Sequence, residues 1–209
     1  WKFHCPCDTI ELSLFYERTQ RSIMDGKKLM ETALELGFAD AALIRTDELV
    51  FIPAFRALCE ENECGKYGVN YACPPDCGTV EEMKQKVLRW RQALVMQTMW
   101  DIEDPLDNEQ IKPAKTEHNR LTRRLIEKAA EPGLMIGASG CSLCSPCAIT
   151  EGAPCRFPGL RYSCMSAYCI FVKDMADRCG MDYECAPGIT TFFSMYCFDE
   201  RTPELSEDR

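Results

Sequence analysis

Apolar residues recur at steps of three and four along four stretches of the chain, which is the spacing that places them on one face of a helix. The first helix is expected over residues 22–36, with Ser22 as its N-cap and Gly37 as its C-cap. The second opens at Thr79 and Glu82, which have the spacing of a capping box. Two further helices are expected over residues 112–130 and 163–179.

Shorter stretches of apolar and β-branched residues predict strands. Residues 41–44 and 49–52 flank a polar turn, and we expect them to form two strands. Three more strands are expected over residues 93–100, 134–138 and 189–198. Because helices and strands alternate along the chain, the sequence predicts an α/β fold in which helices pack on a small mixed sheet. We expect a single domain over residues 22–200, with an irregular segment at 1–21 and a polar tail at 201–209.

Cysteine is the residue whose content departs from an ordinary globular composition, with 15 among 209 residues. A secreted disulfide framework is usually short, rich in loops and even in its cysteine count, whereas this chain is long, partly helical and odd in its count. No secretory leader is recognisable at its start, so we expect reduced thiols in the cytoplasm. Clustered reduced cysteines indicate metal binding.

The formal net charge of −9 argues against some classes of partner. An acidic surface repels phosphate backbones, so nucleic acid and anionic membrane are disfavoured. No run of about 18 apolar residues is present that would span a membrane. With two histidines and no glycine-rich phosphate loop, the sequence contains no sign of a histidine-based catalytic site or a nucleotide site. A redox partner protein is the expected partner, and the oligomeric state is open.

The strongest signal is a C-x2-C-x2-C run formed by Cys141, Cys144 and Cys147, with Cys155 eight residues further on. Three thiolates at this spacing wrap one face of an iron–sulfur cubane, and bacterial ferredoxins use the same run. Cys155 is the expected fourth ligand. The adjacent Arg156 is expected either to hydrogen-bond cluster sulfur or to pair with a nearby carboxylate. A zinc site made of four cysteines is the alternative.

A second constellation lies in a loop rich in glycine and proline, where Cys59, Cys64, Cys73 and Cys77 fall within 19 residues. Cys73 precedes Pro74, a Cys-Pro step that is also found in ferredoxins. We expect the first three cysteines to be the core ligands and Cys77 to be the fourth. If Cys77 does not ligate, one iron is open to substrate or water. Zinc is again the alternative.

The two loops together resemble the predicted metal-binding protein family, also called domain of unknown function 2284. The resemblance rests on residues 55–68 with Cys73 and the two prolines after it, and on residues 140–147 with residues 154–158 and Arg161. It extends over roughly residues 25–200. It implies a prokaryotic, mostly anaerobic setting and a bound metal, expected to be iron–sulfur. Residues 162–169 depart from the family pattern, because they lack its proline, glutamate and glycine and contain additional cysteines.

Seven cysteines remain outside the two predicted ligand sets. Three of them fall on apolar faces and are expected to pack as small hydrophobic residues, namely Cys169, Cys179 and Cys197. The roles of the other four are open, namely Cys5, Cys7, Cys164 and Cys185. Either Cys164 or Cys185 could replace one of the ligands named above.

The sequence therefore predicts an iron–sulfur protein that binds one or two [4Fe–4S] clusters and transfers electrons at low potential to a partner protein. Two other functions stay open. One is a reductase-type enzyme with an open cluster iron, and the other is a structural zinc-binding module.

Overall fold

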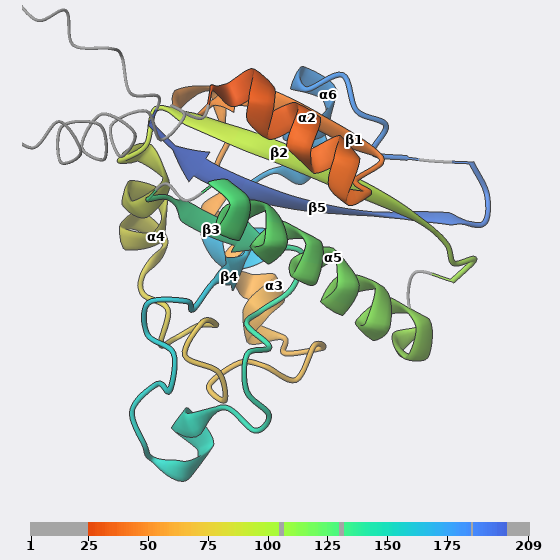
Figure 1. The fold of residues 1–209 in the computed structure, drawn as a ribbon. Coiled ribbons are helices and arrows are strands. Elements are labelled where there is room, and N and C mark those ends of the chain that lie inside the picture. Colours follow the sequence, from red (N-terminus) through yellow and green to blue (C-terminus); the bar gives the residue numbers. More distant parts are fainter. Residues whose placement is uncertain (1–24, 105–106, 130–131, 185, 200–209) are drawn as a thin grey trace, which may run out of the picture.

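In the computed structural model, which describes residues 25–104, 107–129, 132–184 and 186–199, five strands form one mixed sheet at the centre of the protein (Figure 1). In chain order they are β1 (Asp40–Arg45), β2 (Gln92–Asp101), β3 (Leu134–Gly137), β4 (Ser163–Cys164) and β5 (Ile189–Phe198). Their spatial order is β1-β2-β5-β3-β4. The β3–β4 pair is parallel and the other neighbouring pairs are antiparallel. The predicted α/β class with a mixed sheet is confirmed.

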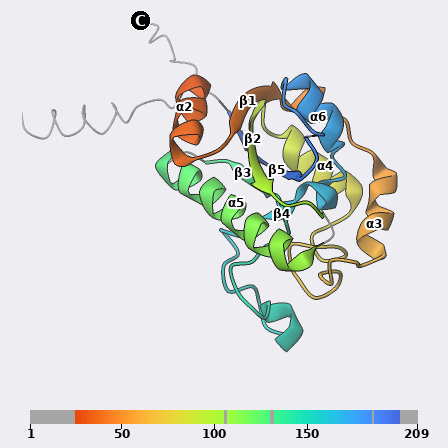
Figure 2. The ribbon, with the colours of Figure 1, turned by 90° about the vertical axis from the view of Figure 1, so that its right-hand side faces the viewer.

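Alternation along the strands divides the core into two layers, one on each face of the sheet. In β5, Tyr196 and Phe198 face one layer, whereas Met195 and Cys197 face the other. Helices α2 (Gly26–Leu36) and α5 (Asn108–Ala129) cover the first face, and α4 (Val80–Leu88) and α6 (Val172–Arg178) cover the second (Figure 2). The sheet is thus buried on both sides, as its apolar strands predict.

Helix ends follow local capping chemistry. Gly37 ends α2 in the left-handed conformation with φ 104°, and Thr79 and Glu82 form the predicted capping box of α4. The side chain of Asp25 caps α2 by accepting a hydrogen bond from the Lys27 amide, whereas the predicted cap Ser22 lies outside the described residues. Helix α5 begins at Asn108, four residues earlier than predicted, because the Asp107 carboxylate accepts the Glu109 amide.

The strand predicted at residues 49–52 is wrong. The chain forms a 3₁₀ helix at Thr46–Glu48, and afterwards Phe51 makes an isolated bridge with Ile170. The Thr46 amide donates to the carbonyl of Arg91, so β1 takes β2 as its partner. β1 therefore pairs with a strand that is distant in sequence, and the second of the two predicted strands does not form.

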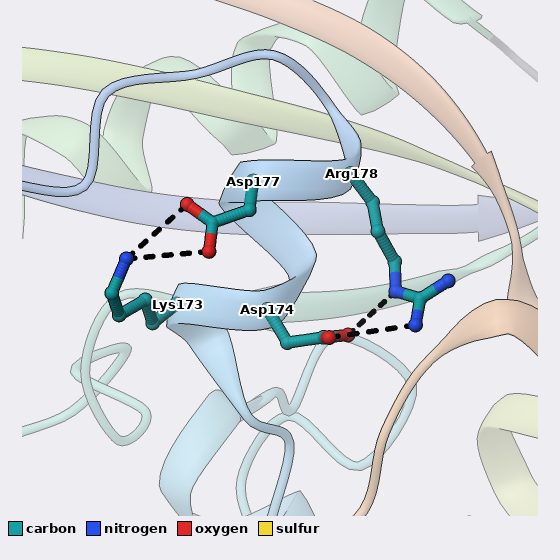
Figure 3. A network of polar contacts seen from close by, with 4 residues as sticks. All are labelled: Lys173, Asp174, Asp177 and Arg178. Atoms are coloured by element: carbon teal, nitrogen blue, oxygen red, sulfur yellow. Dashed lines mark hydrogen bonds and ion pairs between the residues drawn. The ribbon is translucent and has the colours of Figure 1, made fainter.

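The helix predicted over residues 163–179 is wrong in its first half. Ser163 and Cys164 pair with β3, and a 3₁₀ turn at Met165–Tyr168 ends at Cys169 in the left-handed conformation, with φ 57°. A left-handed residue cannot continue a right-handed helix, so α6 begins only at Val172. Two ion pairs at i, i+4 spacing lie on its exposed side, Lys173–Asp177 at 3.2 Å and Arg178–Asp174 at 2.6 Å (Figure 3).

The cysteine-rich segments 56–78 and 140–161 leave the sheet at the same end of the protein (Figure 1). The first opens with the short helix α3 (Arg56–Glu60), and the second contains a 3₁₀ helix at Ala148–Glu151. Both otherwise lack regular structure, as their glycines and prolines predict. In the described part of the chain, no helix is both long enough and apolar enough to cross a membrane.

Candidate metal centre

The two cysteine-rich loops are bound to each other. Asn70 Nδ2 donates to the carbonyl of Cys141 at 2.8 Å, and the Tyr71 hydroxyl donates to the carbonyl of Ala153 at 2.9 Å. A Cβ added to Gly140 would lie 2.8 Å from Cys73 Sγ. Only glycine therefore lets the chain that carries Cys141 pass so close to Cys73. The two predicted ligand sets are neighbours in space although they are distant in sequence.

The structure brings the four cysteines predicted in the second loop around one small surface hollow. Cys141, Cys144, Cys147 and Cys155 are each half-buried and have free thiols. Residues from both loops complete the lining of the hollow, among them Asn70, Tyr71, Leu143, Phe157 and Arg161. We call these four cysteines the second set.

The second set is held partly by backbone amides. Burial raises the pKa of Cys147, but amide hydrogen bonds from Ile149 and Tyr71 outweigh it, so the pKa lies below its ordinary value. Burial raises the pKa of Cys141, and its neighbour Cys144 raises it further. Amide donors favour a thiolate, the form of cysteine that binds metals. The Tyr71 amide comes from the first loop, so the two loops share this interaction.

Arg156 lies beside the second set. Its Nη1 donates to the carbonyl of Pro146 at 3.0 Å, and its Nη2 forms an ion pair with Glu151. A hydrogen bond with the Cys144 thiol and this ion pair raise the pKa of the guanidinium. The arginine thus has both kinds of neighbour that its sequence position suggested, a thiol of the predicted site and a carboxylate. Whether it contacts a bound group stays a prediction.

Three of the cysteines predicted in the first loop interact with one another, and one of them, Cys73, lies next to Gly140. Cys59 lies on α3, Cys64 is exposed in the loop, and Cys73 is 5% exposed. Burial raises the pKa of Cys73 well above its ordinary value, and the neighbouring thiolates of Cys164 and Cys64 raise it further. Burial and then Cys164 raise the pKa of Cys59 to about 11. These thiols lie close enough to act on one another.

Cys77, the predicted fourth ligand of the first loop, has different surroundings. It interacts with Cys73, but its side chain belongs to the core cluster that includes Met83 and Val87. Its sulfur lies 3.8 Å from Nη1 of Arg56, and burial raises its pKa although Arg56 lowers it. The structure therefore places Cys77 at the edge of this group of thiols.

Two residues that sequence reasoning did not assign to a site lie near the first loop. Cys164 interacts with Cys59 and Cys73. The sequence left it open as a replacement ligand, but no spacing signal tied it to the first loop because it follows more than 90 residues later. Lys115 of α5 places its Nζ 5.4 Å from the centre of the Phe192 ring. Burial lowers the pKa of Lys115, and the charges of Cys164 and Cys64 partly oppose that shift.

The remaining described cysteines pack as predicted. Cys169 and Cys197 are fully buried. Cys179 packs against the core cluster that contains Cys197. His118 is also a core residue, with its Nδ1 2.7 Å from Thr98 Oγ1, and burial lowers its pKa to about 3. Cys5, Cys7 and Cys185 lie outside the described residues, as do the predicted segments 1–21 and 201–209.

The donor chemistry of the two loops suits a thiophilic metal. Among the described residues, no three His, Cys, Asp or Glu side chains stand around a single position that would hold one metal ion as they are placed. The thiols nevertheless share a hollow in the second set, and glycine makes room for Cys73 in the first. Sets made of thiols alone match zinc and iron–sulfur centres and exclude the oxygen-ligated cations.

Comparison with curated proteins found no match, and comparison with solved structures found none either. A family described as "Predicted metal-binding protein (DUF2284)" matches residues 42–198. The match includes both cysteine-rich loops and extends to the end of β5, so it covers most of the chain and all eight predicted ligands. It agrees with the resemblance carried by the two loop motifs. The chain belongs to the DUF2284 family of predicted metal-binding proteins.

Proposed function

We propose that this metal-binding protein holds one or two [4Fe–4S] clusters on its two cysteine sets and passes single electrons to a partner protein. The observation that carries the proposal is the convergence of Cys141, Cys144, Cys147 and Cys155 on one hollow, beside the loop that contains Cys73. A bound cluster supplies a centre that accepts and releases one electron. The residues of the chain supply its ligands, its hydrogen bonds and its access to solvent.

The second set is the better match to a cubane. Its first three cysteines have the ferredoxin spacing. Backbone amides of Ile149, Ala148 and Tyr71 act on Cys147, and amide bonds to sulfur are among the features that set a cluster's potential. The C-x2-C-x2-C spacing, and not these amides, is what favours the iron–sulfur assignment over a zinc site of four cysteines.

The contact between the two loops supports electron relay. Gly140 directly precedes Cys141 and packs against Cys73 Sγ, so ligands of both sets lie on either side of one peptide segment. Clusters held on these sets would be neighbours within a single fold. Electrons could then enter at one cluster and leave at the other without a change in the sheet.

The surface around the loops supports docking of a protein partner. Four large apolar side chains that are at least two-fifths exposed belong to these loops, namely Leu58, Val69, Phe157 and Leu160. Exposed acidic residues lie between Cys59 and Cys64, at Glu60, Glu61 and Glu63. Exposed apolar and acidic side chains on these loops suit a partner whose docking face is apolar and basic. A reducing cytoplasm is the compartment that keeps such thiols free.

Purification without oxygen, followed by iron and sulfide counting, tests the proposal. We expect a brown protein that absorbs near ~400 nm and carries about four or about eight iron atoms per chain with equal sulfide. Reduction should produce an EPR signal that is reversible on reoxidation. A colourless protein that carries zinc would replace the proposal with the structural zinc module.

A further inference from the structure

Cys164 lies at a point where the sheet meets the first loop. In β4 it is paired with Gly137 of the parallel strand β3. Beyond Gly137 the chain of β3 continues for three residues to Gly140, which packs against Cys73 Sγ. The end of the sheet therefore places Cys164 and Cys73 at the same edge. The pairing of β4 with β3 fixes this placement. The spacing of residues within either loop does not.

The element that follows Cys164 packs against the helix that carries Cys59. Residues Met165–Tyr168 form a 3₁₀ turn directly after Cys164, and this turn contacts α3. Arg56, at the start of α3, donates through Nη2 to the carbonyl of Ala167 at 3.0 Å. This bond ties α3 to the turn, so Cys59 and Cys164 lie on two elements that are held together.

Electrostatic interactions link the same thiols. Burial is the largest cause that raises the pKa of Cys59 and of Cys73, and in both the strongest charge is that of Cys164. Burial likewise raises the pKa of Cys164, and Cys64 is the thiolate that raises it further. Lys115 interacts with Cys164 and Cys64, and supplies a positive charge beside them. These four thiols act on one another, but Cys77 also acts on Cys73, so the contacts of Cys77 decide whether it belongs with them.

Cys77 is held by contacts with Arg56 of α3, with Lys86 and with the core. Its sulfur faces Arg56, its carbonyl accepts from Lys86 Nζ at 2.7 Å, and its side chain is 5% exposed within the core. Moving the thiol toward Cys59 would break these contacts and leave space in the core, which is costly. Arg56 thus contacts the sulfur of Cys77 through one guanidinium nitrogen and binds the turn after Cys164 through the other.

We infer that Cys59, Cys64, Cys73 and Cys164 form the thiolate ligand set of the first metal centre, and that Cys77 is not a ligand. The ligands then come from a helix, a loop and a sheet strand. This inference rests on the proposed function, because it names a ligand of the same metal centre. Each thiol releases its proton to solvent as its sulfur binds the metal.

The test compares Cys164→Ser with Cys77→Ser in the full-length chain, purified without oxygen, with Cys73→Ser as the reference for loss of the first centre. Iron, zinc and sulfide are counted per chain, and folding is checked by circular dichroism. Where the wild type carries metal on both sets, we expect Cys164→Ser and Cys73→Ser to lose about half of it, and Cys77→Ser to lose none. The reverse order of the Cys164 and Cys77 variants would overturn the inference.

Serine sometimes keeps a metal through its oxygen, so a second measurement is needed. The EPR spectrum of reduced Cys164→Ser should then change, whereas that of Cys77→Ser should match the wild type. Full metal with an unchanged spectrum in Cys164→Ser would show that Cys164 only packs against the core. If Cys77→Ser also kept its metal and its spectrum, the first centre would have three cysteine ligands and an open position, which is the arrangement of the reductase-type enzyme. A wild type that carries zinc refutes the iron–sulfur function, yet the same variants still identify the ligands.

Discussion

The second cysteine set lies within a single loop, whereas the first collects thiols from α3, from a loop and from β4. All members of the second set fall between Cys141 and Cys155, and a short chain segment is enough to bring them around one hollow. The first set needs the pairing of β3 with β4 and the packing of α3 on the following turn. A local ligand set can be recognised from spacing, and a set assembled from distant segments cannot.

The two sets also differ in how their surroundings shift the pKa of a cysteine thiol. In the second set, backbone amides lower the pKa of Cys147. In the first, burial and neighbouring thiols raise the pKa of Cys59 to about 11. A metal that binds the first set must displace more tightly held protons. Part of its binding free energy therefore offsets the cost of removing those protons. Cys147 is therefore closer than Cys59 to the protonation state that binds metal before any metal arrives.

The largest effect is expected from removing a central ligand of the local set. Cys144→Ser should eliminate the metal of the second set and leave that of the first, because the hollow loses one of its four thiols. Metal per chain should fall by about half if both sets are loaded, and residues 140–161 should become sensitive to protease. Elemental analysis and limited proteolysis measure these changes.

Cys179→Ala, which changes a half-buried cysteine that packs against the core, is the control and should retain all metal. Unchanged metal in Cys144→Ser would contradict the assignment of the second set.

Gly140→Ala tests the contact between the two sets, which is made where Gly140 packs against Cys73. The new Cβ would lie 2.8 Å from Cys73 Sγ, so Cys73 or the backbone must shift. Overpacking of this kind costs about 1–3 kcal/mol, and we expect that loss in the free energy of unfolding by denaturant. Gly159→Ala is the matched control in the same loop, since nothing lies within 4 Å of its added Cβ. Equal stability of the two variants would mean that the sets are not in contact.

Alkylation of metal-stripped protein compares the reactivity of one cysteine from each set. Cys59 and Cys147 are both half-buried, but the pKa of Cys59 is about 11 and that of Cys147 is below its ordinary value of 9.0. The thiolate is the reactive form, so the rate at Cys59 should rise about tenfold per pH unit from pH 7 to pH 10. The rate at Cys147 should be higher at pH 7 and level off earlier. Peptide mass spectrometry after iodoacetamide pulses measures both rates, and parallel pH profiles would refute the difference.

The smallest effect is expected on α6, which belongs to neither set. Asp177→Asn removes the ion pair between Lys173 and Asp177, whose side chains are about half exposed (Figure 3). Exposed pairs of this kind stabilise a protein by less than about 1 kcal/mol, so the unfolding midpoint should hardly move and the metal content should not change. Denaturant titration and elemental analysis provide the check. A loss of metal here would mean that metal binding depends on the stability of the whole fold, and would weaken the comparison of the two sets.

Much of the fold was accessible from patterns within short segments. The capping box of Thr79 and Glu82 located the start of α4, and alternation located β5 at Ile189–Phe198 without error. The failures came where a distant partner decided the conformation. Residues 49–52 look like a strand but make only a single bridge, between Phe51 and Ile170, and residues 163–164 look like the start of a helix but pair with β3. Periodicity reports the local preference of a segment and not what lies beside it.

The sequence by itself determined the class of fold, the position of both cysteine-rich loops and the four thiols of the second set, because each depends on residues that are close along the chain. The tertiary structure decided that Gly140 joins the two loops, that Cys77 faces Arg56 and the core, and that Cys164 lies near Cys59 and Cys73. The physical reason is that strand pairing and helix packing bring together residues more than 90 positions apart. No spacing rule within a loop contains that information.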